Sequence, residues 1–351
     1  MLSTKLLNTV YRVPYTAKQK LFNFSRDPKG IFTNKLRSTL GEKRYTNLQY
    51  SSPIYDVRRW FLNREGKRAY AAEKVHMQLN SLQRRIVNDL SKNGIAVVHF
   101  SELFPNVDFR ELQEFAESLL QEPENKEQVT KILNGFRPAN PLGLVMKFYL
   151  VRLLGNKPAF HYDDKFVELV LSDEILRIVC GYFGSFVRIA DMDFWCNVPT
   201  EEPDAYSQTW HRDSEDKKLV KLFLWLRDVD ATTGPFYYIP GTHSEGVHNK
   251  FHPQTRVVSK YPPAGAVDEY FSPEQKVRFT GEAGTLIFCD TAGLHKGGHP
   301  TTGLRLLFTA LYSTDAGWDY GDRFSILGLD RERLSPAAGY AAGRARTHRI
   351  I

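Results

Sequence analysis

The second half of the chain divides into short β-rich segments with no helix-length segment between them. Glycine, proline, asparagine and aspartate separate these segments, which span residues 187–198, 218–229, 235–239, 277–280, 285–289 and 304–313. Because no crossover helices alternate with them, the pattern disfavours a parallel doubly wound sheet. Aromatic residues make up 13% of the chain and favour strands, so the pattern predicts a mainly β domain.

Helical patterns come before these strands. In residues 71–92, Val75, Leu79, Leu82, Ile86 and Leu90 recur at spacings of four, three, four and four, and Asn93-Gly94 ends the pattern. Residues 95–100 form a short β-rich run. Residues 108–121 and 164–182 are predicted to be helical, the second with a break near Ser172-Asp173. Helices followed by many short strands indicate a jelly roll, the cupin-like double-stranded β-helix, with N-terminal helices packed on it.

This pattern divides the chain into three parts. We assign residues 71–325 to the double-stranded β-helix domain, residues 1–70 to a basic extension with short helices at most, and residues 326–351 to a peripheral, Arg-rich tail. Residues 1–44 hold ten Lys or Arg and two acids, a net charge of +8, whereas the whole chain carries +7. This arm can contact nucleic acid, acidic lipid or an acidic partner. A solvated arm folded back on its own domain is the alternative that we favour.

Cysteine content and hydropathy indicate the compartment. The cysteines, Cys180, Cys196 and Cys289, are too few for a disulfide framework and form no CxxC pair. We therefore expect buried, reduced thiols. The first residues lack the apolar core of a signal peptide, and no apolar run is long enough to span a membrane. The sequence predicts a soluble, cytoplasmic protein.

Trp210-His211-Arg212-Asp213 stands just before a predicted strand. Residues two apart on an extended chain point to the same side, so His211 and Asp213 can present an imidazole and a carboxylate to one point. A second histidine would complete a facial triad, which leaves coordination positions open for substrate and O₂. His243, His248, His252, His295 and His299 are the downstream candidates. His295 is favoured, because it follows the strand 285–289 and lies far enough beyond Asp213 for most of a sandwich between them.

Arg305 lies on a predicted strand with apolar neighbours on both faces, ten residues after His295. A buried guanidinium without a partner is costly, so it needs an anion. An internal ion pair with Asp or Glu is one solution. The other, which we favour, is the distal carboxylate of 2-oxoglutarate, whose keto-acid end chelates the metal.

At these residues the chain resembles the phytanoyl-CoA dioxygenase family, over about two thirds of its length. The matching stretches, in order, are Gly94–Phe100, Glu174–Arg177, Asn197, Trp210–Asp213, Trp225, Gly234, Pro240–His243, His295 and Arg305. The resemblance implies a double-stranded β-helix, Fe(II), and hydroxylation coupled to conversion of 2-oxoglutarate and O₂ into succinate and CO₂. It implies that His211, Asp213 and His295 bind the metal and that Arg305 anchors the cosubstrate.

The resemblance also implies two further contacts to the cosubstrate. Trp225 matches a tryptophan that lines the cosubstrate pocket, although plain core packing explains it nearly as well. Lys157 matches a lysine that helps to hold 2-oxoglutarate, with Lys221 as a competitor. Asp213 favours hydroxylation over halogenation, because the related halogenases lack this carboxylate. Nothing marks a coenzyme A site, so we do not carry over an acyl-CoA substrate.

The sequence therefore predicts a catalytic centre made of His211, Asp213, His295 and Arg305. The expected function is Fe(II)- and 2-oxoglutarate-dependent oxidation of a small organic or lipid-like metabolite. Two alternatives stay open: a non-catalytic jelly-roll binding protein, and a metal-dependent cupin-type isomerase that needs no O₂. The sequence does not identify the substrate or the oligomeric state.

Overall fold

A computed structural model describes residues 53–136, 147–254, 261–317 and 323–344, with side chains from residue 56 to residue 343. The backbone separates into two units, Met1–Asp56 and Val57–Ile351, and all the strands belong to the second. The predictions for residues 1–44 lie outside the described residues.

Two antiparallel sheets form the core of the fold. The larger sheet has the order β1-β8-β5-β10-β4-β2 and consists of β1 (Ile95–His99), β8 (Thr285–Cys289), β5 (Val220–Trp225), β10 (Arg305–Ser313), β4 (Arg188–Asn197) and β2 (Leu150–Arg152). The smaller sheet has the order β7-β6-β9 and consists of β7 (Val277–Phe279), β6 (Phe236–Tyr238) and β9 (His295–Gly297). A separate parallel pair joins β3 (Ala159–His161) and β11 (Ser325–Leu327).

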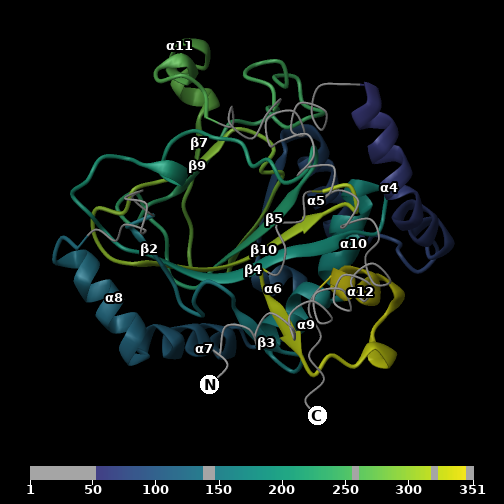
Figure 1. Ribbon diagram of the computed structural model, residues 1–351, viewed down its shortest axis with the longest axis horizontal. Coiled ribbons are helices and arrows are strands. Elements are labelled where there is room, and N and C mark those ends of the chain that lie inside the picture. Colours follow the sequence, from purple (N-terminus) through teal and green to yellow (C-terminus); the bar gives the residue numbers. More distant parts are fainter. Residues whose placement is uncertain (1–52, 137–146, 255–260, 318–322, 345–351) are drawn as a thin grey trace, which may run out of the picture. The chain divides into compact units, whose positions relative to one another are not determined.

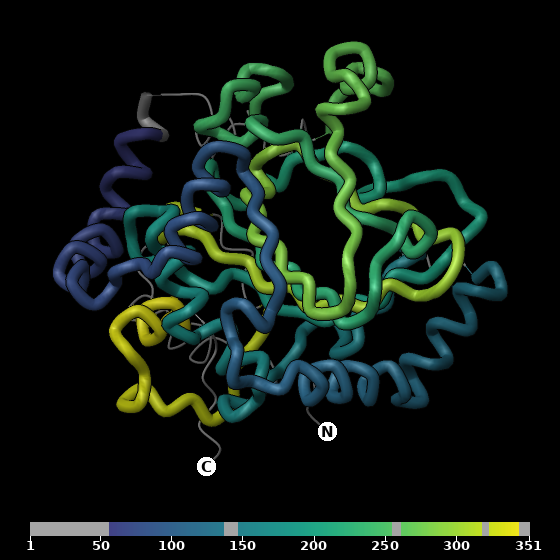
Figure 2. The backbone as a smooth tube through the Cα atoms, turned by 180° about the vertical axis from the view of Figure 1, so that it is seen from behind, coloured from purple at the N-terminus to yellow at the C-terminus, as the bar shows by residue number. Residues whose placement is uncertain are grey.

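The chain passes back and forth between the two sheets. After β4 in the large sheet, His211 pairs with His295 at the edge of the small sheet. The chain then enters β5 in the large sheet, β6 and β7 in the small one, β8 in the large, β9 in the small and β10 in the large. This alternation defines a double-stranded β-helix, so the predicted fold class is confirmed. Figure 2 shows the yellow-green C-terminal strands beside teal and green segments that lie much earlier in the chain.

Strand β5 shows how the sheets divide the interior. Leu222 and Leu224 face the main hydrophobic core with the helices, whereas Phe223 and Trp225 belong to the cluster between the sheets. All residues of β10 are buried, because one side packs on helices and the other on the small sheet. Figure 1 shows α5, α9, α10 and α12 on one side of the large sheet, opposite β7 and β9. The side chains on the other face of these strands therefore point into the space between the two sheets.

The helices surround this core. They are α4 (Pro53–Ala72), α5 (Ser81–Asn93), α6 (Phe100–Leu103), α7 (Phe109–Gln121), α8 (Pro123–Leu133), α9 (Lys165–Leu171), α10 (Asp173–Phe183), α11 (Ala266–Tyr270) and α12 (Pro336–Ala341), with 3₁₀ turns at Tyr206–Gln208, Pro273–Gln275, Arg331–Arg333 and Ala342–Arg344. Ser172 ends α9 and caps α10, as the predicted break required. Gly94 ends α5 in the left-handed conformation. Among the described residues, no helix has the length and apolar character needed to cross a bilayer.

Three local predictions were wrong. The helix expected over residues 71–92 begins only at Ser81, because Asn80 and Gln83 form a reciprocal capping box that starts a new helix. The 20-residue α4 precedes it, where the sequence predicted short helices at most. The tail is not peripheral in its described part, because Ala337, Ala338 and Ala341 are small enough for α12 to pack into the main core.

Candidate metal centre

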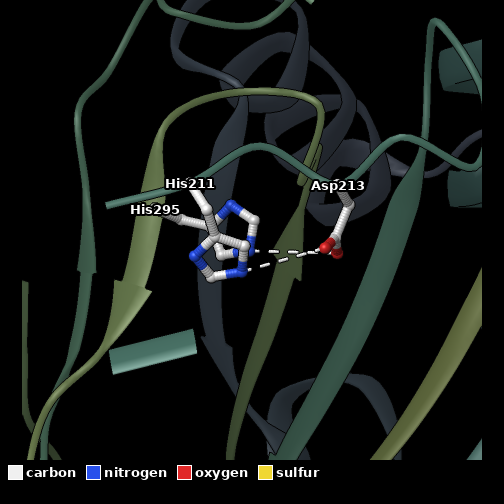
Figure 3. A group of neighbouring side chains, drawn as sticks. All are labelled: His211, Asp213 and His295. Atoms are coloured by element: carbon white, nitrogen blue, oxygen red, sulfur yellow. Dashed lines mark ion pairs between the residues drawn. The ribbon is translucent and has the colours of Figure 1, made fainter. Parts of the chain in front are cut away.

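Three ligand-type side chains meet where the HxD segment crosses the small sheet. His211 and His295 exchange backbone hydrogen bonds of 2.9 and 3.0 Å, and Asp213 N–H donates to Thr291 O at 2.8 Å. One ligand atom from each of His211, Asp213 and His295 lies within 4.8 Å of the other two. Figure 3 shows both imidazoles pointing towards the carboxylate. The structure thus brings together the two histidines and the aspartate that the sequence selected.

Backbone carbonyls fix the orientation of both imidazoles. The Nδ1 atom of His211 lies 2.8 Å from Thr209 O, and that of His295 lies 3.0 Å from Gly293 O. A carbonyl only accepts, so each Nδ1 carries a proton, and in the neutral ring Nε2 then has the lone pair that a metal ion needs. Both Nε2 atoms lie 3.8 Å from Asp213 carboxylate oxygens. The histidine side chains are 5% exposed and that of Asp213 is 13% exposed, so water has little access.

Arg212, between the two ligands, ties this segment to neighbouring loops. Its buried guanidinium donates to the carbonyls of Thr242, of Ala292 at 2.6 Å, and of Phe251 and His252 at 2.9 Å each. Ala292 lies in the loop that leads to His295, so one side chain holds both ligand-bearing segments. Burial lowers the pKa of Arg212 to about 10. Sequence reasoning did not find this role, because nothing local distinguishes the residue from an exposed arginine.

Arg305 differs from Arg212 in its partners. It is 6% exposed, and it donates through Nη1 to Gly234 O, while its buried Nε has no hydrogen-bond partner. Burial lowers the pKa of Arg305 to about 10. Within the described part of the chain, no carboxylate forms an ion pair with Arg305, so the internal ion pair considered from the sequence is not formed there. An anion that bound beside Arg305 would therefore offset part of the free-energy cost of burying this guanidinium.

The triad and Arg305 line one cavity, which opens to solvent. Its walls are largely aromatic and apolar, with Phe223, Trp225, Phe236 and Leu307 between the sheets. Gly297 leaves room beside the guanidinium, because a Cβ there would stand 3.2 Å from Arg305 Nη2. The other lining residues are Lys147, Leu150, Trp195, Asn197, Ser207 and Lys221. The cavity therefore joins a metal-type ligand set to a cation that can receive an anion.

The lysines of the cavity differ from the predicted one. Lys157 is exposed in the turn between β2 and β3 and does not line the cavity. Lys221 does line it, with Nζ 3.7 Å from Asp213 Oδ2 and 4.9 Å from the centre of the Trp195 ring. Lys147 also lines it, with Nζ 5.6 Å from the same ring. No sequence pattern marks Lys147, whose position follows from the pairing of Leu150 with Asn197 on β4.

Trp225 and Tyr261 also lie at the site. Trp225 is 2% exposed and both lines the cavity and packs in the cluster between the sheets, so the two roles weighed for it coincide. Tyr261, which sequence reasoning missed, stacks on His211 with ring centroids 5.6 Å apart. Its partial burial, together with the charge of Asp213, raises its pKa to about 12.

The competing histidines lie elsewhere. His243 is buried with Nε2 3.2 Å from Ser91 O, and His299 Nε2 donates to Thr200 O at 2.6 Å and lies 3.3 Å from the hydroxyl of Thr200. His248 packs against Phe271, and His252 is a turn residue with a φ of 40°. Over the described residues, the triad is the one group of three or more such side chains that could hold a metal ion.

Comparison with solved structures gives matches to iron- and 2-oxoglutarate-dependent enzymes. One is EctD from S. alaskensis with bound Fe, at 16% identity and a TM-score of 0.47, covering 78% of this chain and 89% of that one. Another is the non-heme alpha ketoglutarate dependent epimerase SnoN from nogalamycin biosynthesis, at 17% identity and a TM-score of 0.41, covering 67% and 81%. A third is HygX from Streptomyces hygroscopicus with nickel and 2-oxoglutarate bound, at 18% identity and a TM-score of 0.42, covering 70% and 90%.

No protein-family model matches the chain, and no curated protein matches it in sequence. At these identities and TM-scores, the structural matches do not decide the chemistry. The residues of the cavity are therefore the basis for assigning a function.

Proposed function

We propose that this protein is an Fe(II)- and 2-oxoglutarate-dependent dioxygenase that oxidises, most simply by hydroxylation, a small organic or lipid-like metabolite. The observation that carries the proposal is the buried Arg305, which has no acidic partner among the described residues and lies in the same cavity as two imidazoles and one carboxylate. A non-catalytic core would have no use for such a guanidinium, because its burial costs free energy.

The donor set fits ferrous iron. Two neutral imidazole nitrogens and one carboxylate oxygen on one side of a site form the facial triad that suits non-haem Fe(II). Thr209 and Gly293 hold both rings in the required tautomer. When bound, iron with 2-oxoglutarate would supply the oxidising power for attack on a C–H bond.

The surrounding residues bind and orient the reactants. In this proposal Arg305 pairs with the distal carboxylate of 2-oxoglutarate, in the space that Gly297 leaves open. Trp225 forms a wall of the cosubstrate pocket, and Lys147 and Lys221 make the cavity electropositive, in place of the Lys157 expected from the sequence. The apolar lining restricts water, which strengthens each of these ionic contacts.

The phytanoyl-CoA dioxygenase resemblance, carried by the motifs quoted above, is part of the proposal. So is the assignment of residues 71–325 to the oxygenase domain, flanked by the basic extension 1–70 and the tail 326–351. Asp213 supports hydroxylation over halogenation because its carboxylate would bind the iron where a halogenase needs room for a halide.

The test is conversion of 2-oxoglutarate to succinate without added substrate, in protein reconstituted anaerobically with Fe(II) and then exposed to O₂. We expect slow turnover, abolished in Asp213→Ala and Arg305→Gln and unchanged in Lys157→Met. A metal-dependent isomerase would consume no O₂, and a binding protein would give no iron-dependent succinate. Either result, with iron shown to be absent or inert at the triad, would overturn the proposal.

A further inference from the structure

Helix α4 has an outward face that the proposed chemistry does not use. Val57, Trp60 and Phe61 are 66%, 64% and 47% exposed on it. Their spacings of three and four residues place them side by side on a helix. Single exposed apolar residues are ordinary, but a cluster that includes two aromatic rings marks an interaction surface.

The opposite face of α4 is fixed to the fold. Leu62 is buried, Asn63 Oδ1 accepts from Ala316 N–H at 2.9 Å, and Gly66 O accepts from Phe186 N–H at 3.1 Å. Arg59 on the same side pairs with the buried carboxylate of Asp216. These contacts set the rotation of the helix, so the aromatic cluster is held facing outward.

Cations continue the outward face beyond the aromatic cluster. Arg64, Lys67 and Arg68 are exposed one to two turns further along, and Glu65 is the acid among them. The first half of the face is thus apolar and the second half basic. A bilayer surface has the same division, because its negatively charged headgroups cover an apolar interior. The outward face of α4 therefore suits the headgroup region of a bilayer.

The charge of the preceding arm points to the same partner. Residues 1–44 carry +8, the same sign as the basic half of α4. An anionic surface would attract both. Tryptophan and basic side chains are together enriched where proteins meet lipid headgroups, which favours a membrane over an acidic protein.

We infer that this outward face docks reversibly on an anionic lipid surface, with the rings at headgroup level and the cations at phosphates. The α4 face comprises Val57, Trp60, Phe61, Arg64, Lys67 and Arg68. The apolar area is small, so docking depends on charge and weakens as salt screens it. The inference does not depend on the proposed function.

The experiment is binding of the full chain to vesicles made of equal parts phosphatidylserine and phosphatidylcholine, against vesicles of phosphatidylcholine alone. We expect binding to the anionic vesicles, lost at high salt, with brominated lipid quenching the fluorescence of Trp60. Since each basic residue near such a surface contributes about 1 kcal/mol, Arg64→Gln with Arg68→Gln should weaken binding about 30-fold. Trp60→Ser should weaken binding and remove the quenching.

Matched controls carry the same chemical changes elsewhere. Arg331→Gln with Arg333→Gln removes two exposed charges, and Val247→Ser removes an apolar side chain that is 86% exposed. Both controls should bind as the parent does. The inference would be overturned if the α4 substitutions left binding unchanged. It would also be overturned if the protein bound neutral vesicles equally well, or if it bound neither kind of vesicle. Circular dichroism confirms that each variant is folded.

Discussion

Arg305 and Arg212 are both buried arginines, but we expect their substitution to have opposite effects on stability and on ligand binding. Both are buried guanidiniums whose pKa falls from 12.5 to about 10. That fall corresponds to about 3 kcal/mol by which burial disfavours the charged form. Arg212 donates to four backbone carbonyls, whereas Arg305 donates to one and leaves its Nε without a partner. The structure therefore assigns Arg212 to stability and Arg305 to a ligand.

Substitution by glutamine separates the two roles. Arg212→Gln removes donors from buried carbonyls, so its free energy of unfolding should fall by at least about 3 kcal/mol. Arg305→Gln removes an uncompensated charge as well as one hydrogen bond, so its free energy of unfolding should change by less than about 1 kcal/mol. Its affinity for 2-oxoglutarate should fall at least about 30-fold, because the truncated charge pair is worth about 2 kcal/mol or more.

Urea denaturation of the metal-free variants measures the first quantity. Calorimetric titration of 2-oxoglutarate into the Mn(II)-loaded protein, under argon, measures the second. An Arg305→Gln variant as unstable as Arg212→Gln, with 2-oxoglutarate binding unchanged, would refute the reasoning. The guanidinium would then be a structural donor to Gly234 and no more.

Three further predictions follow from the cavity and its surroundings. Gly297→Ala should weaken binding of 2-oxoglutarate in calorimetry while leaving Fe(II) stoichiometry intact, because its Cβ enters the space beside the guanidinium; unchanged affinity would place the cosubstrate elsewhere. Lys147→Met and Lys221→Met should each raise the KM for 2-oxoglutarate several-fold, whereas Lys157→Met should not, and an effect confined to Lys157 would contradict the assignment. Burial raises the pKa of Asp193 from 3.8 to about 6, so the folded state binds the extra proton between these values and loses stability as pH rises through them. Relative to Asp193→Asn, the wild type should therefore lose about 2 kcal/mol of unfolding free energy between pH 4 and pH 7, and a constant difference would refute this.

Local pattern was enough to predict part of the site. His211 and Asp213 share a face because of strand periodicity, and Arg305 is conspicuous as a charge within an apolar strand. The order of helices and short strands was enough for the fold class. These features depend on neighbours in the sequence, which is why they could be identified without coordinates.

Long-range pairing decided the rest. His295 was already favoured from its place after the strand 285–289, but its backbone pairing with His211, which brings the two imidazoles together, is created only by the alternation of strands between sheets. Lys147 enters the cavity through the pairing of β2 with β4, and the loosely matched Lys157 does not. The restart of the helix at Ser81 was visible in Asn80 and Gln83 as a capping box, a signal that the apolar periodicity overrode.

The convergence of the three ligands can be measured directly. Crystals loaded anaerobically with Fe(II) should give an anomalous difference peak at the iron edge, within bonding distance of His211 Nε2, His295 Nε2 and a carboxylate oxygen of Asp213. Iron found at another position, or no iron in crystals in which these three side chains stand apart, would contradict the account.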